Sequence, residues 1–197
     1  EHAVAVNSAT SALHIALMAL GVGAGDTVWT SPNTFVASSN AALYCGASVD
    51  FVDIDLHTYN LSIISLREKL EQAAVLGALP KVLIPVHLTG QPCDMRAIHE
   101  LSQQYGFKVV EDASHAIGAS YTLLDKNIKK KIKIGSCTHS DITVFSFHPV
   151  KIITTGEGGM ALTNKLNIYE KLKLLRTHGI TRETKLMKKK SDGPWYY

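Results

Sequence analysis

The sequence predicts an α/β protein, a three-layer sandwich in which helices cover both faces of a mostly parallel central sheet. Short runs of apolar and β-branched residues alternate with amphipathic segments of about ten residues or more, as strands and helices do in such folds. The chain has 197 residues, of which 46% are hydrophobic, so it can bury a core of domain size. Polar residues also cluster directly after several of the predicted strands.

Seven short apolar segments are the predicted strands, and polar or turn-forming residues follow each of them. In chain order they are Ala3–Val6, Thr27–Thr30, Ser48–Val52, Lys81–Val86, Phe107–Val110, Ile142–Phe147 and Met160–Leu162. A Gly-rich turn with Gly156, Gly158 and Gly159 separates the last two strands.

Five segments with apolar residues at helical spacing are the predicted helices, and their strict alternation with the strands predicts the parallel sheet. They are Ala12–Leu20, Val36–Tyr44, Ser65–Leu76, Met95–Tyr105 and Leu166–His178. The pattern breaks between Ala119 and Ile134, where we expect an exposed hairpin with the lysine-rich stretch at its tip. Its arms would be Ser120 with Tyr121 on one side and Lys133–Gly135 on the other. The segment Gly179–Gly193 is predicted to be a loop.

Five polar clusters fall at the carboxyl ends of predicted strands, where parallel sheets bind their ligands. They are Ser8–Ser11, Ser31–Phe35, His87–Gly90, Asp112–His115 and Ser146–His148. The first cluster joins a strand to a helix, and its hydroxyls and free backbone N–H groups make an anion site. The alternative for that cluster alone is plain N-capping of the helix.

Lys151 lies in an apolar stretch, next to Val150, Ile152 and Ile153. We expect these neighbours to hold the amine out of water, which favours its neutral form, the form that attacks a carbonyl group. This is the chemistry of a lysine that forms a Schiff base. The alternative is a lysine whose charged end reaches solvent from the end of a strand.

Asp112 and His115 stand at the end of another buried strand. A carboxylate at such a position needs a cationic or hydrogen-bonding partner. A protonated pyridine nitrogen would be one, and the carboxylate would keep that nitrogen protonated so that the ring can withdraw electrons. His115 would then reach the phenolic oxygen or the face of the ring; the alternative is a core histidine that is hydrogen-bonded to the backbone.

The composition argues against several other classes of protein. The net charge is +3, and its lysine patches, Lys126–Lys133 and Lys185–Lys190, have no interleaved aromatic residues, so no nucleic-acid partner is expected. Cys45, Cys93 and Cys137 are scattered, which favours reduced thiols in the cytoplasm over disulfides or a metal site. No apolar run has the length of a membrane span, so no membrane partner is expected. A Rossmann-type dinucleotide enzyme is disfavoured because no G-x-G-x-x-G follows the first strand.

Five stretches of the sequence match one family of enzymes. They are Asn7–Leu13, Ile84–Gly90, Glu111–Gly118, Phe145–Lys151 and Thr154–Gly159. With them the sequence resembles the DegT/DnrJ/EryC1/StrS family, the sugar-aminotransferase branch of the fold-type-I pyridoxal-phosphate enzymes. The similarity covers essentially the whole chain and implies that residues 1–197 belong to the pyridoxal-phosphate-binding large domain. We expect a truncated fragment of that domain, without its N-terminal segment and without the small C-terminal domain.

The resemblance implies a role for each matching residue. Lys151 would carry the cofactor, pyridoxal 5′-phosphate, as a Schiff base and would later move a proton, and Asp112 would pair with the pyridine nitrogen. The other cofactor-binding residues would be Thr10, Ser11 and Ser146 at the phosphate, Phe35 stacked on the ring and His115 beside the ring oxygen. A branch of the family that dehydrates its substrate has histidine in place of the lysine, and Lys151 argues against that branch.

The resemblance also implies a reaction and partners. Glutamate would donate its amino group, and the acceptor would be a nucleotide-sugar, a UDP-linked 4-keto-6-deoxy amino sugar. The stretches Ser140–Lys151, His178–Arg182 and Gly193–Tyr197 look like the subgroup that serves pseudaminic acid biosynthesis. The full-length form would be a homodimer in which the partner subunit helps to close the phosphate site. The alternative from another class is a non-catalytic or truncated remnant of the family that serves as an interaction module.

Overall fold

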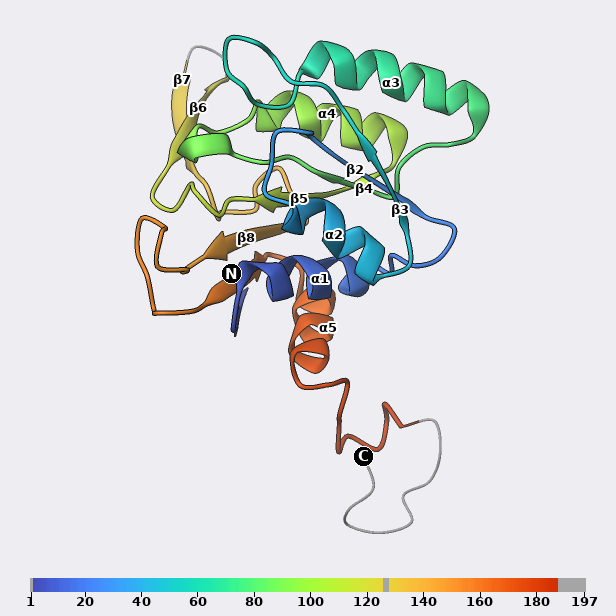
Figure 1. Ribbon diagram of the computed structural model, residues 1–197, viewed down its shortest axis with the longest axis vertical. Helices are drawn as coiled ribbons and strands as arrows, with labels where there is room; N and C mark the ends of the chain where they lie inside the picture. Colours follow the sequence, from blue (N-terminus) through green and yellow to red (C-terminus); the bar gives the residue numbers. More distant parts are fainter. Residues whose placement is uncertain (1, 126–127, 188–197) are drawn as a thin grey trace.

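The computed structural model describes residues 2–125 and 128–187, and its main feature is a seven-stranded sheet between two layers of helices (Figure 1). The strands of this sheet are β1 (His2–Val6), β2 (Thr27–Thr30), β3 (Ser48–Phe51), β4 (Val82–Ile84), β5 (Lys108–Asp112), β8 (Ile142–Ser146) and β9 (Gly159–Thr163). The helices are α1 (Ala9–Ala19), α2 (Ala37–Tyr44), α3 (Ile63–Leu76), α4 (Met95–Tyr105) and α5 (Leu166–Arg176), with a 3₁₀ turn, η1, at Leu88–Gly90. A separate two-stranded sheet consists of β6 (Ser120–Asp125) and β7 (Ile128–Lys133).

The strand order in the large sheet is β1-β9-β8-β5-β4-β2-β3. The strands from β8 to β3 run parallel to one another, whereas β9 is antiparallel to both of its neighbours, β1 and β8. The predicted α/β sandwich with a mostly parallel sheet is therefore confirmed. Because the carboxyl ends of the parallel strands meet at one edge, the segments that follow them are brought together there.

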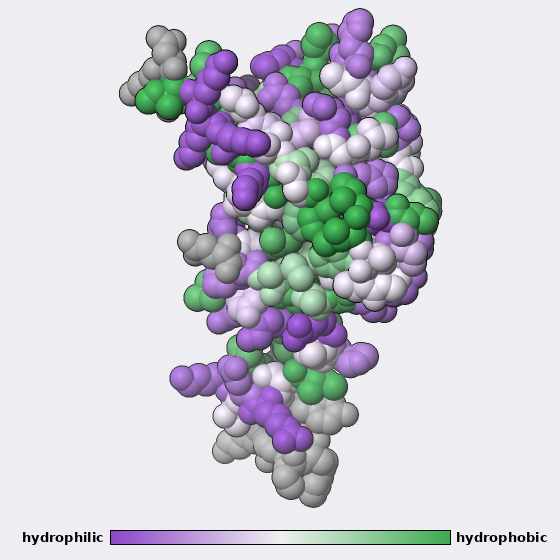
Figure 2. Space-filling model, turned by 90° about the vertical axis from the view of Figure 1, so that its left-hand side faces the viewer, coloured by the Kyte–Doolittle hydropathy of each residue, from purple (hydrophilic) through white to green (hydrophobic). Residues whose placement is uncertain are grey.

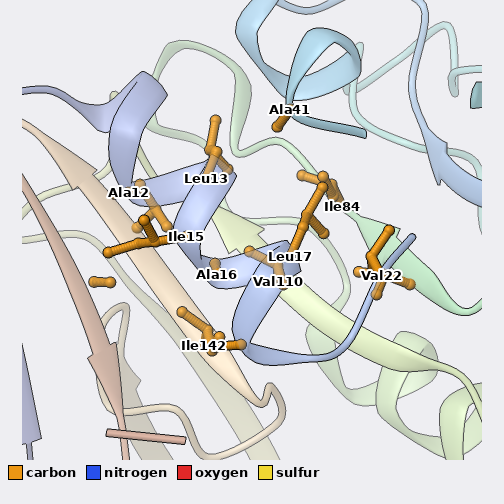
Figure 3. Packing of buried hydrophobic residues seen from close by; sticks show 14 of the residues in the cluster. Ala12, Leu13, Ile15, Ala16, Leu17, Val22, Ala41, Ile84, Val110 and Ile142 are labelled. Carbon is orange, nitrogen blue, oxygen red and sulfur yellow. The ribbon is translucent and has the colours of Figure 1, made fainter. Parts of the chain in front are cut away.

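Helices α1, α2 and α5 cover one face of the sheet, and α3 and α4 cover the other (Figure 1). On the first face, Leu13 and Leu17 of α1 are fully buried in a cluster that includes Val110 and Ile142 of the sheet (Figure 3). Alanines at several buried positions of α1 and α2 let these helices approach the strands closely. This packing fixes the N-terminus of α1 against the carboxyl edge of the sheet.

The second core lies under α3 and α4 and uses the alternate side chains of the same strands. Val110 belongs to the cluster under α1, whereas its neighbour Val109 belongs to the cluster under α3 and α4. Side chains alternate along a strand, so Asp112 points to the α1 side of the sheet and Glu111 to the opposite side. The alternation places the carboxylates of Asp112 and Glu111 on opposite faces of the sheet.

Several boundaries differ from those predicted. Helix α1 begins at Ala9, three residues earlier than predicted, because Ser8 caps it by accepting a hydrogen bond from the backbone N–H of Ser11. Strand β5 continues to Asp112 because its end pairs with the loop after β4 and with β8.

The lysine-rich stretch forms an arm of the predicted hairpin, β7, and does not form its tip. Antiparallel pairing runs from Ser120 and Lys133 to Asp125 and Ile128. The alternation of exposed lysines with the buried Ile132 and Ile134 holds this arm against the domain.

Two expectations from the sequence concern membrane-spanning segments and the C-terminal stretch of the chain. None of the helices found in residues 2–125 and 128–187 is long and apolar enough to cross a membrane. The stretch Gly193–Tyr197, which resembles a subgroup of the family, lies outside the described residues.

Candidate active site

A cavity of about 330 Å³ opens at the carboxyl edge of the sheet, between the N-terminus of α1 and the loops that follow β4, β5 and β8. All five predicted polar clusters contribute to its wall. From these clusters the lining residues are Ser8 and Thr10, Thr34 and Phe35, His87 and Leu88, Asp112, Ser114 and His115, and Ser146 and His148. Lys151 lies on the same wall.

The N-terminus of α1 supplies the part of the site that suits an anion. Ser8 and Thr10 line the cavity, and the first backbone N–H groups of the helix have no partner within the helix. Ser146, which is buried at the end of β8, lines the cavity as well. Ser11 is not part of the wall; its hydroxyl donates to Asn7 Oδ1 at 2.6 Å and lies 3.0 Å from Ser8 Oγ, which orders the turn.

Two glycines in the Gly-rich turn allow this close packing. A Cβ atom on Gly159 would lie 2.3 Å from the carbonyl carbon of Ser8, and one on Gly158 would lie 2.3 Å from Thr155 Oγ1. Only glycine lets β9 approach the cap of α1 so closely. The turn therefore places the anion-binding end of α1 against the sheet.

The Asp112 carboxylate is held at the cavity by two donors. Its Oδ2 accepts a hydrogen bond from Ser38 Oγ at 2.7 Å, and its Oδ1 accepts one from the Ser114 backbone N–H at 3.2 Å. The side chain is buried, with 4% of the residue exposed, and a carboxylate has room for further donors on its two oxygens. An N–H group of a ligand in the cavity can therefore donate a hydrogen bond to the Asp112 carboxylate. Ser114 belongs to a predicted polar cluster, whereas Ser38 was not predicted; the signal for Ser38 in hindsight is a serine in an alanine-rich helix.

Lys151 and His115 form a hydrogen-bonded pair on the cavity wall, with 2.8 Å between Lys151 Nζ and His115 Nε2. Burial and the neighbouring Lys151 cation lower the pKa of His115 below its usual 6.5, although Asp112 acts in the opposite direction. A neutral imidazole accepts a hydrogen bond at Nε2, and the amine of Lys151 donates it. The predicted alternative of a backbone-bonded core histidine does not describe this contact.

The predicted burial of Lys151 by its apolar neighbours is wrong. Val150, Ile152 and Ile153 are 77%, 64% and 51% exposed. They lie in a tight turn, where neighbouring side chains point in different directions and do not pack around the lysine. Lys151 reaches the cavity because the turn, closed by a hydrogen bond from its backbone N–H to His148 O at 2.9 Å, directs it there.

We expect His115 to titrate below pH 6.5 in the wild-type protein and at a higher pH in a Lys151→Ala variant. Removing the lysine takes away a cation that disfavours the imidazolium, so the pKa of His115 must rise. Nuclear magnetic resonance of the imidazole protons against pH measures both values. An unchanged pKa in the variant would show that the two groups do not interact in solution. His57, an exposed histidine, serves as the internal reference.

Phe35 stands at the rim of the cavity, with 72% of the residue exposed. The η1 turn closely approaches the backbone that carries His115, since a Cβ atom on Gly90 would lie 2.8 Å from His115 O. Gly90 has φ +92°, which L-residues with a side chain rarely adopt. The structure thus brings six of the seven predicted site residues to one cavity and places Ser11 directly behind its wall.

Comparison with known proteins places the sequence in one family. The sequence model of the DegT/DnrJ/EryC1/StrS aminotransferase family matches residues 1–193. GDP-perosamine synthase of Caulobacter vibrioides is 43% identical over 180 residues, which cover 91% of this chain and 44% of that protein. The chain spans less than half the length of the curated relatives it matches, from 44% to 47%.

Solved structures share the fold. The structure of ntda from Bacillus subtilis with bound cofactor PMP has a TM-score of 0.78 at 29% identity, covering 97% of this chain and 40% of that one. Helicobacter pylori PseC, an aminotransferase involved in the biosynthesis of pseudoaminic acid, has a TM-score of 0.75 at 29% identity, covering 95% and 46%. The family match extends over almost the whole chain, and the solved structures share its fold. The chain belongs to the DegT/DnrJ/EryC1/StrS aminotransferase family.

Proposed function

We propose that this chain is the cofactor-binding part of an aminotransferase that moves an amino group from glutamate to a UDP-linked 4-keto-6-deoxy amino sugar. The observation that carries the proposal is the arrangement of three groups on one cavity wall. Lys151 is hydrogen-bonded to His115, and His115 lies within the electrostatic reach of Asp112. One small ring can therefore contact an amine, an imidazole and a carboxylate at the same time.

Pyridoxal 5′-phosphate is the cofactor, and the cavity suits each of its parts. When bound, it supplies an electron-withdrawing ring that stabilises negative charge on the carbon undergoing exchange. The carboxylate of Asp112 pairs with the ring nitrogen and keeps it protonated. Lys151 would hold the cofactor, and its Nζ atom would hold and move a proton.

The remaining predicted residues bind and orient the cofactor. Thr10 and Ser146 donate to the phosphate, together with the N–H groups at the start of α1. Ser11 supports them from behind, through its hydroxyl contacts and its backbone N–H. Phe35 covers the face of the ring, and His115 orients the amine of Lys151 and stands beside the ring oxygen.

The sugar substrate is proposed from the family and its named relatives. One relative is named a synthase of a GDP-linked amino sugar, and one structural neighbour serves pseudaminic acid biosynthesis. Both support a nucleotide-linked sugar as the amino acceptor. The UDP group, the keto group at C4 and the glutamate donor are the finer parts of the proposal, for which the sequence resembles the pseudaminic acid subgroup.

We further propose that the complete protein is a cytoplasmic homodimer with a small domain after this large one. Apolar surface lies in the middle of the face shown in Figure 2, the face on the left of Figure 1. Phe35 and Val150, which line the cavity, are 72% and 77% exposed, and a second subunit would cover them. The three cysteines are free thiols, which suits a reducing compartment.

The proposal is tested on the full-length protein with pyridoxal 5′-phosphate added. We expect the absorbance band of a lysine-bound cofactor, and continued formation of 2-oxoglutarate from glutamate, beyond one equivalent per cofactor, only when a UDP-linked 4-keto-6-deoxy amino sugar is present. A GDP-linked keto sugar serves as the comparison substrate, and light scattering gives the mass of the dimer. A protein without the cofactor band would be the non-catalytic remnant. Equal or faster turnover of the GDP-linked sugar would overturn the proposed substrate.

A further inference from the structure

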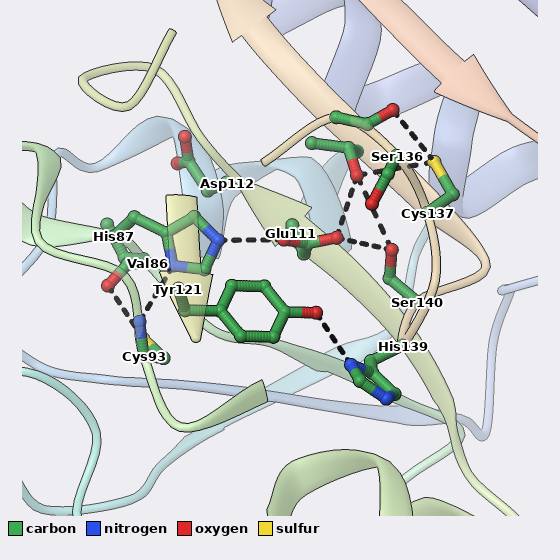
Figure 4. Close-up of polar contacts among 12 residues, drawn as sticks. Val86, His87, Cys93, Glu111, Asp112, Tyr121, Ser136, Cys137, His139 and Ser140 are labelled. Carbon is green, nitrogen blue, oxygen red and sulfur yellow. Dashed lines mark hydrogen bonds and ion pairs between the residues drawn. The ribbon is translucent and has the colours of Figure 1, made fainter. Parts of the chain in front are cut away.

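A second polar cluster, the buried clamp, reaches the cavity wall at His87 and consists of Glu111, His87, Ser140 and Thr143 (Figure 4). His87 has no exposed surface, and Glu111 is 3% exposed. Glu111 is the neighbour of Asp112 in β5 but points to the opposite side of the sheet. The proposed reaction gives no role to any member of the clamp.

Glu111 is the centre of the clamp. Its Oε2 lies 2.8 Å from His87 Nε2, and its Oε1 accepts hydrogen bonds from Thr143 Oγ1 at 2.8 Å and from Ser140 Oγ. Burial raises the pKa of Glu111, but the hydrogen bond from His87 and those from the two hydroxyls outweigh it and lower the pKa. The group is therefore a buried carboxylate whose two oxygens both accept hydrogen bonds.

The hydrogen bond that His87 makes at Nδ1 indicates which ring nitrogen carries the proton. Burial acts to lower the pKa of His87, whereas contacts with Cys93 and Glu111 act to raise it. The backbone N–H of Cys93, however, donates to His87 Nδ1 at 3.1 Å, and a proton on Nδ1 would face that donor. We therefore place the ring proton on Nε2, where Glu111 accepts it.

The clamp ties together three neighbouring strands. His87 follows β4, Glu111 belongs to β5, and Thr143 belongs to β8. The backbone repeats the connection, since the N–H of His87 donates to Asp112 O at 3.0 Å and the N–H of Asp112 donates to Pro85 O at 2.9 Å. A change in the clamp is thus transmitted directly to the backbone that carries the Asp112 carboxylate.

Stability alone does not explain a buried charge at this place. Replacing a buried charged cluster with well-packed apolar residues often leaves stability unchanged or increases it. Hydrogen bonds fix the direction in which a group is held, whereas apolar packing does not. The clamp connects the end of β5 to both neighbouring strands. His87 links it to β4, and Thr143 links it to β8.

We propose that Glu111 and His87 are positioning residues for Asp112, which hold its carboxylate at the depth and angle that the ring nitrogen of the cofactor requires. The inference rests on the proposed function, because the task of Asp112 belongs to it. Glu111 acts from the other side of the sheet, through the backbone and not by touching the substrate. Its effect is therefore on the geometry of the bound cofactor.

The test compares His87→Leu with His87→Gln in the full-length protein. The amide nitrogen of glutamine can donate to Glu111 as Nε2 does, whereas leucine leaves the carboxylate without that donor. We expect His87→Leu to lower kcat about 100-fold with KM for the sugar little changed, since a displacement of about 1 Å costs that much. We also expect it to weaken binding of pyridoxal 5′-phosphate, measured by absorbance titration, and His87→Gln to recover most of both losses.

Two more variants and a control keep the test decisive. Glu111→Gln and Thr143→Val change the clamp with little change of volume and substitute for His87→Leu should that variant not fold. Ile98→Val removes one buried methyl group from α4 and reports the effect of lost stability alone. Clamp variants with the kcat and cofactor affinity of Ile98→Val overturn the positioning role. A wild-type protein that binds no cofactor overturns the proposed function, and the positioning role with it.

Discussion

Replacing Lys151 with alanine is expected to lower turnover at least about 10⁴-fold, because one amine performs two tasks. In the proposed function, its Nζ atom would bind the cofactor covalently and would afterwards carry the proton. His115, its hydrogen-bonding partner at 2.8 Å, cannot replace it, since an imidazole does not form the covalent link. Steady-state kinetics measure the loss of turnover. Borohydride reduction followed by mass spectrometry of the peptide measures the loss of the covalent link.

Two control variants separate the chemistry of Lys151 from its charge. Lys151→Arg keeps a cation beside His115, but a guanidinium stays protonated and does not attack a carbonyl, so this variant is expected to be as inactive as Lys151→Ala. Lys81→Ala removes a lysine that pairs with Asp26 away from the cavity, and it is expected to retain activity. Covalent cofactor in either Lys151 variant would show that another amine is the attachment point.

The order of elements and the meeting of the polar clusters were predictable from local patterns. Strand β2 and helix α4 have the predicted bounds, Thr27–Thr30 and Met95–Tyr105. The alternation of strands and helices then forces the carboxyl ends of β4, β5 and β8 to one edge of the sheet. For that reason Asp112 and Lys151 reach one cavity although 38 residues separate them in the sequence.

Contacts that depend on side-chain direction were not predictable in the same way. The apolar residues beside Lys151 suggested burial, but they lie in a turn, and sequence neighbours in a turn do not share one side. Glu111 and His87 are 24 positions apart in the sequence. Their pairing depends on which face of the sheet the Glu111 side chain points to and on the path of the loop after β4. The period-two pattern of Ile132 and Ile134 did carry a readable signal for strand β7, which the surrounding lysines obscured.

Asp112→Asn is expected to lower kcat at least about 10³-fold while the protein still binds some pyridoxal 5′-phosphate. The substitution keeps the shape of the side chain but removes the charge that keeps the ring nitrogen protonated. The proposed phosphate contacts at the start of α1 and the proposed link to Lys151 do not involve Asp112, so some affinity is expected to remain. Steady-state kcat and an absorbance titration with the cofactor measure the two effects separately.

Ser38→Ala is the matched control for Asp112→Asn, because it removes the hydrogen bond to Asp112 Oδ2 and leaves the carboxylate charged. A loss of about tenfold or less in Ser38→Ala, beside a loss of three orders of magnitude in Asp112→Asn, assigns the effect to charge and not to placement. Equal losses in the two variants would mean that the orientation of the side chain matters more than its charge. Near-normal kcat in Asp112→Asn would contradict the pairing of Asp112 with the ring nitrogen, because a neutral amide cannot keep that nitrogen protonated.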